Sequence, residues 1–160
     1  MEPKRFQPPD REWWGSFLDE ILTVCPRCEA TALVRPRESG ETQRMMFLPR
    51  RVTCTGCGFN KDWAGNGLHW NERAEPVLDA YFNLPLRLQV RCGGHVLWAF
   101  NHRHLCFLES FVQASLRERP RSPKYGWHNG GLASRLPRWM KDGHRRGAVL
   151  EAIAALRERR

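Results

Sequence analysis

Near the N-terminus the apolar residues recur every three or four positions, which is the spacing of one helix face. These residues are Trp14, Phe17, Leu18, Ile21 and Leu22, with Trp13 widening the face. Asp10 precedes them and can cap the first helical turn through its carboxylate. The pattern predicts a short helix that starts at Asp10 and packs as a lid on the next segment, after a loose, Pro-rich tail at residues 1–9.

Beyond this stripe the pattern changes to short apolar runs separated by turn residues, which is typical of strands. We expect strands at residues 30–34 and 59–63. A return strand through residues 44–53 is expected between them, after a turn at residues 38–41. Pro49 falls inside this return strand and marks an edge or a bulge there.

In the second half, two apolar runs flank a Gly-Gly pair, which is a signal for a β-hairpin. The runs cover residues 86–91 and 95–100. A helix is expected over residues 105–119, where Pro120 stops it. Its apolar stripe consists of Leu105, Leu108, Phe111, Val112 and Leu116.

The C-terminal quarter begins with an exposed loop, rich in turn residues, at 120–131. Ser134 can cap a short helix after this loop, with Pro137 tolerated in its first turn, and Gly143 suits the helix exit. A last helix is expected over residues 145–157. Its buried side chains are expected to be Val149, Leu150, Ile153, Ala154 and Leu156.

These elements predict an α+β fold with an N-terminal helix, a ribbon of short antiparallel strands, a second β-hairpin and C-terminal helices. A chain of 160 residues, of which 41% are apolar, suits one modest domain or two small units that share a core. After the tail we divide it into a helix plus ribbon at 10–74, a hairpin–helix unit at 75–119, and a basic loop with C-terminal helices at 120–160.

Four of the six cysteines form two Cys-x-x-Cys pairs, Cys25 with Cys28 and Cys54 with Cys57. A two-residue gap lets both thiolates of a pair face one ion, so two pairs can close a tetrahedron around a single Zn²⁺. Such a site leaves no position for water or substrate, and we expect it to be structural. The competing interpretation, a redox motif, requires the pair to open a helix within a βαβ unit, and neither pair does so.

The segments CPRC and CTGCG, with 25 residues between the pairs, resemble the four-cysteine zinc ribbons of transcription factors and many bacterial proteins. This resemblance covers about residues 24–64 and implies one structural zinc ion on a β-ribbon. A treble clef would place the second pair at the start of a helix, but the following segment is rich in Gly and Asn, which disfavour helix. Residues 79–157, with CGGHVLWAFN and SRLPRWM, look similar to uncharacterised bacterial proteins that carry a zinc ribbon, and imply no function.

A second group of metal-ligating residue types lies within fifteen residues, namely Cys92, His95, His102, His104 and Cys106. Six residues separate His95 from His102, where a zinc knuckle has four. The residue types suit a second metal ion, but the spacing does not, and these side chains can instead pack as small buried groups. For catalysis the chain offers no Walker A run, no GxSxG and no acidic cluster for Mg²⁺. The residues near His102 and His128 also lack the layout of an HNH-type nuclease. We expect a non-enzymatic protein without a small-molecule substrate.

The net charge of +9 is concentrated near the C-terminus. Residues 117–160 hold twelve Lys or Arg against four Asp or Glu, whereas residues 1–116 hold fourteen against thirteen. Such a segment suits an anionic partner, and we expect DNA or RNA, contacted mainly through phosphates. The candidate contact residues are Arg121, Lys124, Trp127, Arg135, Arg138, Lys141, Arg145 and Arg146.

Trp127 and Trp139 lie among these basic residues and can stack on bases of a single strand, although Trp139 also suits a helical core. The Ala-rich last helix has few polar side chains for reading base edges, which disfavours a sequence-specific helix-turn-helix. The alternative function is a protein–protein interaction subunit of a larger bacterial assembly without nucleic-acid contact. We expect a cytoplasmic protein without membrane contact, because no apolar run is long enough to span a bilayer and the N-terminus lacks a signal-peptide layout.

Overall fold

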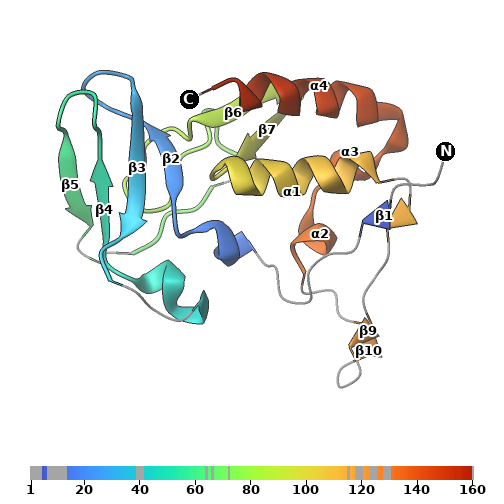
Figure 1. Cartoon of the computed structure of the whole chain (residues 1–160), viewed down its shortest axis with the longest axis horizontal. Helices are drawn as coiled ribbons and strands as arrows, with labels where there is room; N and C mark the ends of the chain where they lie inside the picture. The colour runs from blue at the N-terminus through green and yellow to red at the C-terminus, as the bar shows by residue number, and fades with distance from the viewer. Residues whose placement is uncertain are drawn as a thin grey trace.

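The structure is a computed structural model of the whole chain. It describes residues 5–6, 14–38, 42–63, 65, 67–71, 73–114, 116–117, 121–122, 126–127 and 131–159. Within these residues the fold is mixed α and β, with antiparallel sheets and a C-terminal helix. Figure 1 shows two regions side by side, a four-stranded sheet and a hairpin that carries two long helices. None of the described helices is long and apolar enough to cross a membrane.

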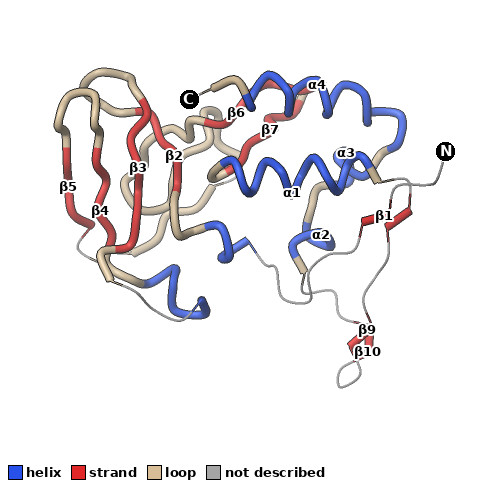
Figure 2. The backbone as a smooth tube through the Cα atoms, viewed as in Figure 1, coloured by secondary structure: helices blue, strands red, loops and turns tan. Residues whose placement is uncertain are grey.

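The four-stranded antiparallel sheet, hereafter the ribbon sheet, carries the cysteine pairs. Its strands lie in sequence order and are β2 (Ile21–Val24), β3 (Thr31–Pro36), β4 (Arg50–Thr53) and β5 (Asn60–Trp63). Val34 of β3 lies between Ile21 and Val52 in register, and all three side chains are buried. β5 lies at the outer edge of the sheet (Figure 2) and is largely exposed, with charged residues of the kind that protect an edge from further pairing.

The predicted N-terminal helix is wrong within the described residues. Trp14–Phe17 form one 3₁₀ turn, η1, and the second half of the predicted helix is strand β2. Three successive side chains of β2 are buried, because the strand is covered on both faces, and such a continuous apolar run imitates a helix stripe. Asp10 and Trp13, assigned to the start of this helix, lie outside the described residues.

The predicted return strand is also wrong in its first part. Thr42–Phe47 form a 3₁₀ helix, η2, and β4 begins at Arg50, directly after Pro49. Proline lacks the N–H that a strand ladder uses, which agrees with pairing that starts only beyond it. The strands predicted at 30–34 and 59–63 are confirmed as β3 and β5, with small shifts of their ends.

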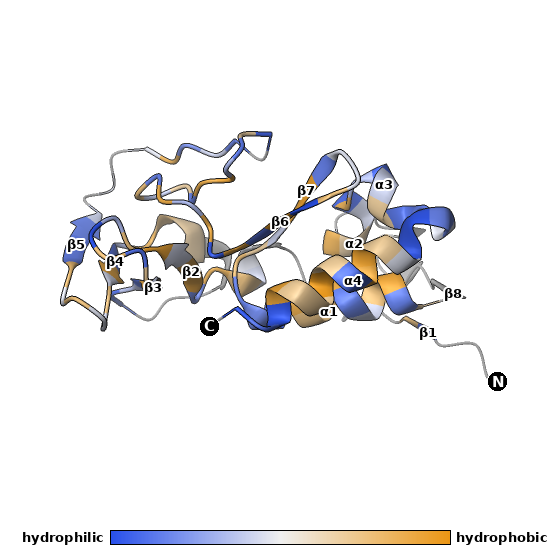
Figure 3. Ribbon diagram, turned by 90° about the horizontal axis from the view of Figure 1, so that it is seen from above, coloured by the Kyte–Doolittle hydropathy of each residue, from blue (hydrophilic) through white to orange (hydrophobic). Residues whose placement is uncertain are grey.

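The second region is built on the predicted hairpin, which is confirmed as β6 (Leu88–Cys92) and β7 (His95–Ala99). Gly93 and Gly94 connect the strands with φ angles of 53° and 81°, the left-handed conformation that a tight type I′ turn requires. Helices α1 (His102–Gln113) and α4 (Arg146–Arg157) pack against the hairpin and against each other, with their apolar sides facing inward (Figure 3).

Helix α1 starts at His102 and ends at Gln113, whereas the prediction was residues 105–119. After it, Leu116–Arg117 form a short strand, β8, that pairs in parallel with β1 (Arg5–Phe6). Residues 1–9 are therefore not entirely a loose tail, and Phe6 is buried with its ring 5.4 Å from that of Phe107. The four apolar positions of α1 predicted before Leu116 are all buried.

Three short elements lead into α4, namely α2 (Leu132–Arg135), α3 (Arg138–Lys141) and η3 (Gly143–Arg145). Ser134 lies inside α2, whose N-cap is Gly131, so the predicted cap is wrong. Pro137 is the N-cap of α3 rather than a residue inside a helix. In α4 the buried side chains are Val149, Ile153 and Leu156. Leu150 is half-buried and Ala154 is exposed, contrary to the prediction.

One hydrophobic cluster runs through both regions, and strand β2 connects them. The N–H of Leu22 donates to the carbonyl of Phe100 at 2.8 Å. Asn101, the buried N-cap of α1, donates its side-chain amide to the carbonyls of Phe17 and Glu20 at 2.9 and 2.7 Å. The start of α1 is thereby attached to the segment that leads into the ribbon sheet.

Candidate metal centre and aromatic cavity

Each cysteine pair lies in a tight turn between two strands, and the two turns have the same backbone hydrogen bonds. The N–H of the first cysteine donates to the carbonyl five residues later, Cys25 to Ala30 and Cys54 to Phe59, both at 2.8 Å. The carbonyl of the first cysteine accepts from the N–H of the residue that follows the second cysteine, at 3.0 and 2.9 Å. This repeated hydrogen bonding turns both thiols of a pair toward the same point.

The residue after each second cysteine has a positive φ angle. It is 60° at Glu29 and 73° at Gly58. The sequence indicates this conformation at Gly58, because glycine adopts it without strain. Glu29 gives no such signal, since a side chain in the left-handed region costs roughly 1–2 kcal/mol and is uncommon there. The symmetry of the two turns is therefore visible only in the structure.

The structure brings the four predicted metal ligands together, with their Sγ atoms all within 4.8 Å of one another. The sulfurs of Cys25 and Cys57, and those of Cys28 and Cys54, are 3.6 Å apart. A tetrahedral ion with metal–sulfur bonds of about 2.3 Å places its ligands about 3.8 Å apart. The four sulfurs therefore fit a metal ion with a shell made only of thiolates.

The first pair of cysteines has pKa values shifted in opposite directions. Burial acts to raise the pKa of Cys25, but backbone N–H groups, including that of Arg27 at 3.4 Å, outweigh it and lower this pKa to about 7. The N–H of Ala30 acts to lower the pKa of Cys28, but the thiols of Cys54 and Cys57 raise it to about 12. One thiolate thus forms readily, whereas four adjacent thiolates require a cation between them.

The second group of possible ligands is not gathered by the fold. His104 is buried in α1, where its Nδ1 accepts from the N–H of Phe100 at 3.2 Å. His95 stacks on Trp139, with ring centroids 4.8 Å apart and planes at 1°. Cys92 is buried and Cys106 is exposed. Within the described part of the chain, the four ribbon cysteines are the only group of three or more such side chains close enough to share an ion.

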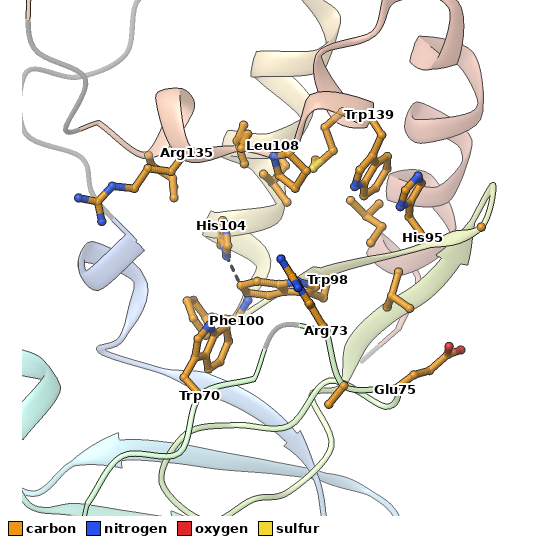
Figure 4. Close-up of a pocket in the computed structure, with 18 residues that line it drawn as sticks. Trp70, Arg73, Glu75, His95, Trp98, Phe100, His104, Leu108, Arg135 and Trp139 are labelled. Atoms are coloured by element: carbon orange, nitrogen blue, oxygen red, sulfur yellow. Dashed lines mark hydrogen bonds between the residues drawn. The ribbon is translucent and has the colours of Figure 1, made fainter.

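A cavity of about 770 Å³ opens between hairpin β6–β7, the loop at residues 70–75, α1 and the short helices α2 and α3 (Figure 4). One wall, hereafter the Trp98 cluster, consists of Trp70, Trp98, Phe100 and His104, whose rings contact one another. The opposite wall is the stack of His95 on Trp139. Of these aromatic residues, the sequence indicated Trp139 as a candidate for stacking. It did not indicate Trp70 and Trp98, which come from separate elements and share no sequence pattern.

Two predicted nucleic-acid contacts lie on the helices that border this cavity. Arg135 of α2 lines it, and Arg138 of α3 follows three residues later. Both are exposed, and neither forms an ion pair with a described residue. Lys124 lies outside the described residues, and Arg121 and Trp127 are described only as backbone in the two-residue strands β9 (Arg121–Ser122) and β10 (Gly126–Trp127), which pair with each other.

Three other predicted contacts are at least partly engaged within the protein. Lys141 donates to the carbonyl of Ser134 at 2.8 Å. Arg145 donates to the carbonyl of Gly93 at 3.1 Å, and Arg146 to that of Ala114 at 3.5 Å. These side chains help to hold α3, η3 and α4 against their neighbours, so among the predicted contacts whose side chains are described, Arg135 and Arg138 are the most available.

Comparisons with protein-family models, with curated protein sequences and with solved structures found no match. Function therefore has to be inferred from the side chains themselves. They offer two separate chemistries, a closed set of four sulfurs and an open aromatic cavity with exposed guanidinium groups nearby. The first can hold a metal ion, and the second can receive a planar or anionic group.

Proposed function

We propose that the protein is a non-enzymatic, zinc-stabilised nucleic-acid-binding protein that contacts DNA or RNA mainly through phosphates. Zinc is favoured because four thiolates in a tetrahedral arrangement suit this ion, and a shell without an open position gives it a structural role. The ribbon then serves as a scaffold, and binding is the task of the surface around α2, α3 and the cavity.

The availability of the arginines around the cavity carries this proposal. Arg73, Arg135 and Arg138 are exposed and form no ion pair with a described residue. Many of the other described arginines are paired with carboxylates, namely Arg35, Arg37, Arg51, Arg91, Arg103 and Arg157, although Arg27 and Arg159 have no carboxylate partner among the described residues. Free guanidinium groups beside aromatic rings are the combination by which proteins bind single-stranded nucleic acids.

The alternative, a protein–protein interaction subunit, is favoured by one different observation. Phe47 at the end of η2 is 67% exposed, which is unusual for a large apolar side chain and suits a hydrophobic contact. This residue lies on the ribbon side of the molecule. The two functions therefore predict binding through different surfaces.

Binding to a labelled mixed-sequence oligonucleotide, measured by fluorescence anisotropy at several salt concentrations, tests the proposal. The logarithm of the binding constant should fall linearly with that of the salt concentration, by about 0.7 per phosphate contacted on a single strand and about 0.9 on a duplex. The double variant Arg135→Gln/Arg138→Gln should weaken binding and reduce this slope by the equivalent of about two phosphates.

The matched control is Arg35→Gln/Arg51→Gln, which removes the same charge from two ion-paired arginines of the ribbon sheet. It should change the affinity much less than the α2–α3 variant does. Equal losses in both variants would mean that net charge alone drives binding. If the protein binds neither a single strand nor a duplex at about 50 mM salt, the proposal is overturned and the protein-interaction alternative is favoured.

A further inference from the structure

The two walls of the cavity present aromatic rings in fixed orientations. Trp98 meets Trp70 at 66°, Phe100 at 65° and His104 at 80°, with centroids 5.1 to 5.8 Å apart. These edge-to-face contacts hold the indole in place on a strand of the hairpin. The volume of about 770 Å³ lies within the roughly 300–1,000 Å³ of sites that bind small molecules. The cavity therefore has the size and the wall chemistry for a planar aromatic group.

A fixed hydrogen-bond donor belongs to the lining. His104 is 3% exposed, and its Nδ1 accepts the N–H of Phe100. Burial lowers the pKa of His104 to about 3, so the ring is neutral near pH 7 and carries its proton on Nε2. This Nε2–H makes no hydrogen bond to any residue that the structure describes. An N–H without a partner among the described residues favours a ligand that brings an acceptor.

The charged side chains of the cavity complement an anion. In Figure 4 the guanidinium of Arg73 points into the cavity, and Arg135 lies at its rim. Glu75, the only acidic residue among the described lining residues, turns its carboxylate away and pairs with Arg91 at 2.5 and 2.8 Å. Among the described lining residues, the charge that remains at the cavity is positive.

We infer that this cavity binds one unpaired nucleobase of a single strand, stacked on the aromatic walls, with an acceptor on the base facing Nε2 of His104. The neighbouring phosphates meet Arg73 and Arg135. The inference rests on the proposed function and adds the chemical group that is recognised. It also makes the protein a single-strand binder, because the bases of a duplex are paired and stacked and cannot enter a cavity.

Two other occupants of aromatic cavities fit this one less well. A methylated ammonium group is attracted to aromatic rings, but here it would lie beside the guanidinium of Arg73, and Glu75, the acidic residue of the described lining, is already paired with Arg91. A proline-rich peptide also docks on aromatic rings, but it has no charge for Arg73 and Arg135 to neutralise.

Three ligands with the same number of phosphates test the inference on the zinc-loaded full-length protein. They are a mixed-sequence single strand, the same strand made of abasic sugars, and a duplex containing the sequence. The intact single strand should bind roughly five- to hundredfold more tightly than the abasic strand, which is the range for stacking one base on an aromatic ring. Its affinity should also exceed that of the duplex.

Two variants of exposed residues assign the effect to the cavity. Trp70, 40% exposed, can be replaced by Ala, and Trp70→Ala should weaken the intact strand roughly five- to hundredfold while leaving the abasic strand unchanged. Arg73→Gln should weaken both strands, since it removes a phosphate contact. Phe47→Ala is the matched control, because it removes an exposed aromatic ring from the ribbon side, and it should change neither affinity.

The outcomes separate this inference from the proposed function. If the intact and abasic strands bind with equal affinity and the usual salt dependence, nucleic-acid binding stands and the base site is wrong. The base site is also wrong if duplex and single strand bind with equal affinity, or if Trp70→Ala leaves the affinity for the intact strand unchanged. If no strand binds at low salt, both the inference and the proposed function fail, and a proline-rich peptide becomes the next ligand to test.

Discussion

The ribbon sheet and the hairpin–helix region are stabilised in different ways. At the cysteine end of the ribbon, Cys28 and Cys57 are exposed, and its outer strand β5 has little buried surface. In the hairpin–helix region, α1 and α4 contribute fully buried side chains such as Leu105, Leu108 and Ile153 to the core. Both regions share one hydrophobic cluster, but the cysteine end of the ribbon lies at its margin, so a bound metal ion would contribute more to stability there than in the region with two packed helices.

The difference extends to the sites. The candidate metal centre is formed by two short sequence segments whose geometry is set by local backbone hydrogen bonds. The aromatic cavity is formed by side chains from the 70–75 loop, the hairpin and three helices. A closed local site suits a structural role, and an open site assembled from distant elements is where specific binding is expected.

The largest expected effect comes from removing the metal ion. In Cys28→Ser, or after chelation, the ribbon should lose the apparent binding free energy of zinc, on the order of 10–16 kcal/mol. Hydrogen exchange measured by mass spectrometry should become fast in β3, β4 and β5, while α1 and α4 keep more of their protection. The exposed thiol of Cys106 provides the control, because Cys106→Ser should leave one zinc per chain and the exchange pattern unchanged.

Equal loss of protection in α1 and α4 would show that the two regions depend on the ion as a single unit. Unchanged protection and unchanged metal content in Cys28→Ser would contradict the metal site itself. Elemental analysis of the purified protein distinguishes these results by counting metal ions per chain. One ion is expected, because the structure gathers one set of four sulfurs within the described residues.

The next effect concerns Asn101, which joins the two regions. Its side chain accepts the N–H of His104 at 2.9 Å and donates to the carbonyls of Phe17 and Glu20. Asn101→Ala removes a helix cap, worth roughly 0.5–2 kcal/mol, and leaves buried carbonyls unpaired, at about 1–3 kcal/mol. We expect the free energy of unfolding in urea to fall by about 3 kcal/mol.

The matched control for Asn101 is a cap on the surface. Asp142 caps η3 by accepting the N–H of His144 at 3.0 Å in an exposed position. Asp142→Ala should lower the free energy of unfolding by about 1 kcal/mol or less. Similar losses in the two variants would mean that the hydrogen bonds between η1, β2 and α1 contribute little beyond ordinary capping.

The features that the sequence predicts correctly occur in both regions, and they are the local ones. Local signals were sufficient for the ligand set, because the spacing of Cys25, Cys28, Cys54 and Cys57 already restricts where the sulfurs can lie. The Gly-Gly turn between β6 and β7 was equally local. Features that depend on a few neighbouring residues are thus readable from the chain alone.

Features that depend on tertiary contacts were missed or wrong. The apolar run at Ile21 and Leu22 looked like a helix stripe, because a strand buried on both faces cannot be distinguished from a helix by period alone. The cavity was missed for a related reason. Trp70 and Trp98 are 28 positions apart in the sequence, and only the fold of the hairpin brings their ring centroids to 5.1 Å.

A smaller effect is the pH dependence of stability that the buried His104 should cause. The pKa of His104 is lowered to about 3 by burial, whereas an unfolded histidine has a pKa of about 6.5. Below pH 6.5 the unfolded state takes up a proton that the folded state does not, so stability falls with acidification, on the order of 1 kcal/mol per pH unit. Above pH 6.5 this contribution is constant.

Urea denaturation at pH 7 and at about pH 5.5 measures this contribution, in a range chosen to limit protonation of metal-bound thiolates. The wild-type protein should lose about 1 kcal/mol more between the two pH values than His104→Gln does. An identical pH dependence in the two proteins would mean that other groups cause the change, and that His104 is not kept neutral by its surroundings.

The smallest effect tests whether the two cysteine turns have equivalent backbones. A Cβ added at Gly58 would meet no atom within 4 Å, so Gly58→Ala introduces only the strain of a positive φ angle. We expect this variant to lower the free energy of unfolding by about 1 kcal/mol. Glu29→Gly removes the same strain from the other turn, but glycine adds freedom to the unfolded chain worth about 0.4–1 kcal/mol.

The net change in Glu29→Gly should therefore be a gain of a few tenths of a kcal/mol, up to about 1 kcal/mol. The contact that Glu29 makes with Arg87 uses the backbone carbonyl, at 3.4 Å, and survives the substitution. Thermal unfolding of the zinc-loaded protein detects both shifts. A marked loss of stability in Glu29→Gly would show that the glutamate side chain itself supports the first turn, and that the two halves of the metal site differ in more than sequence.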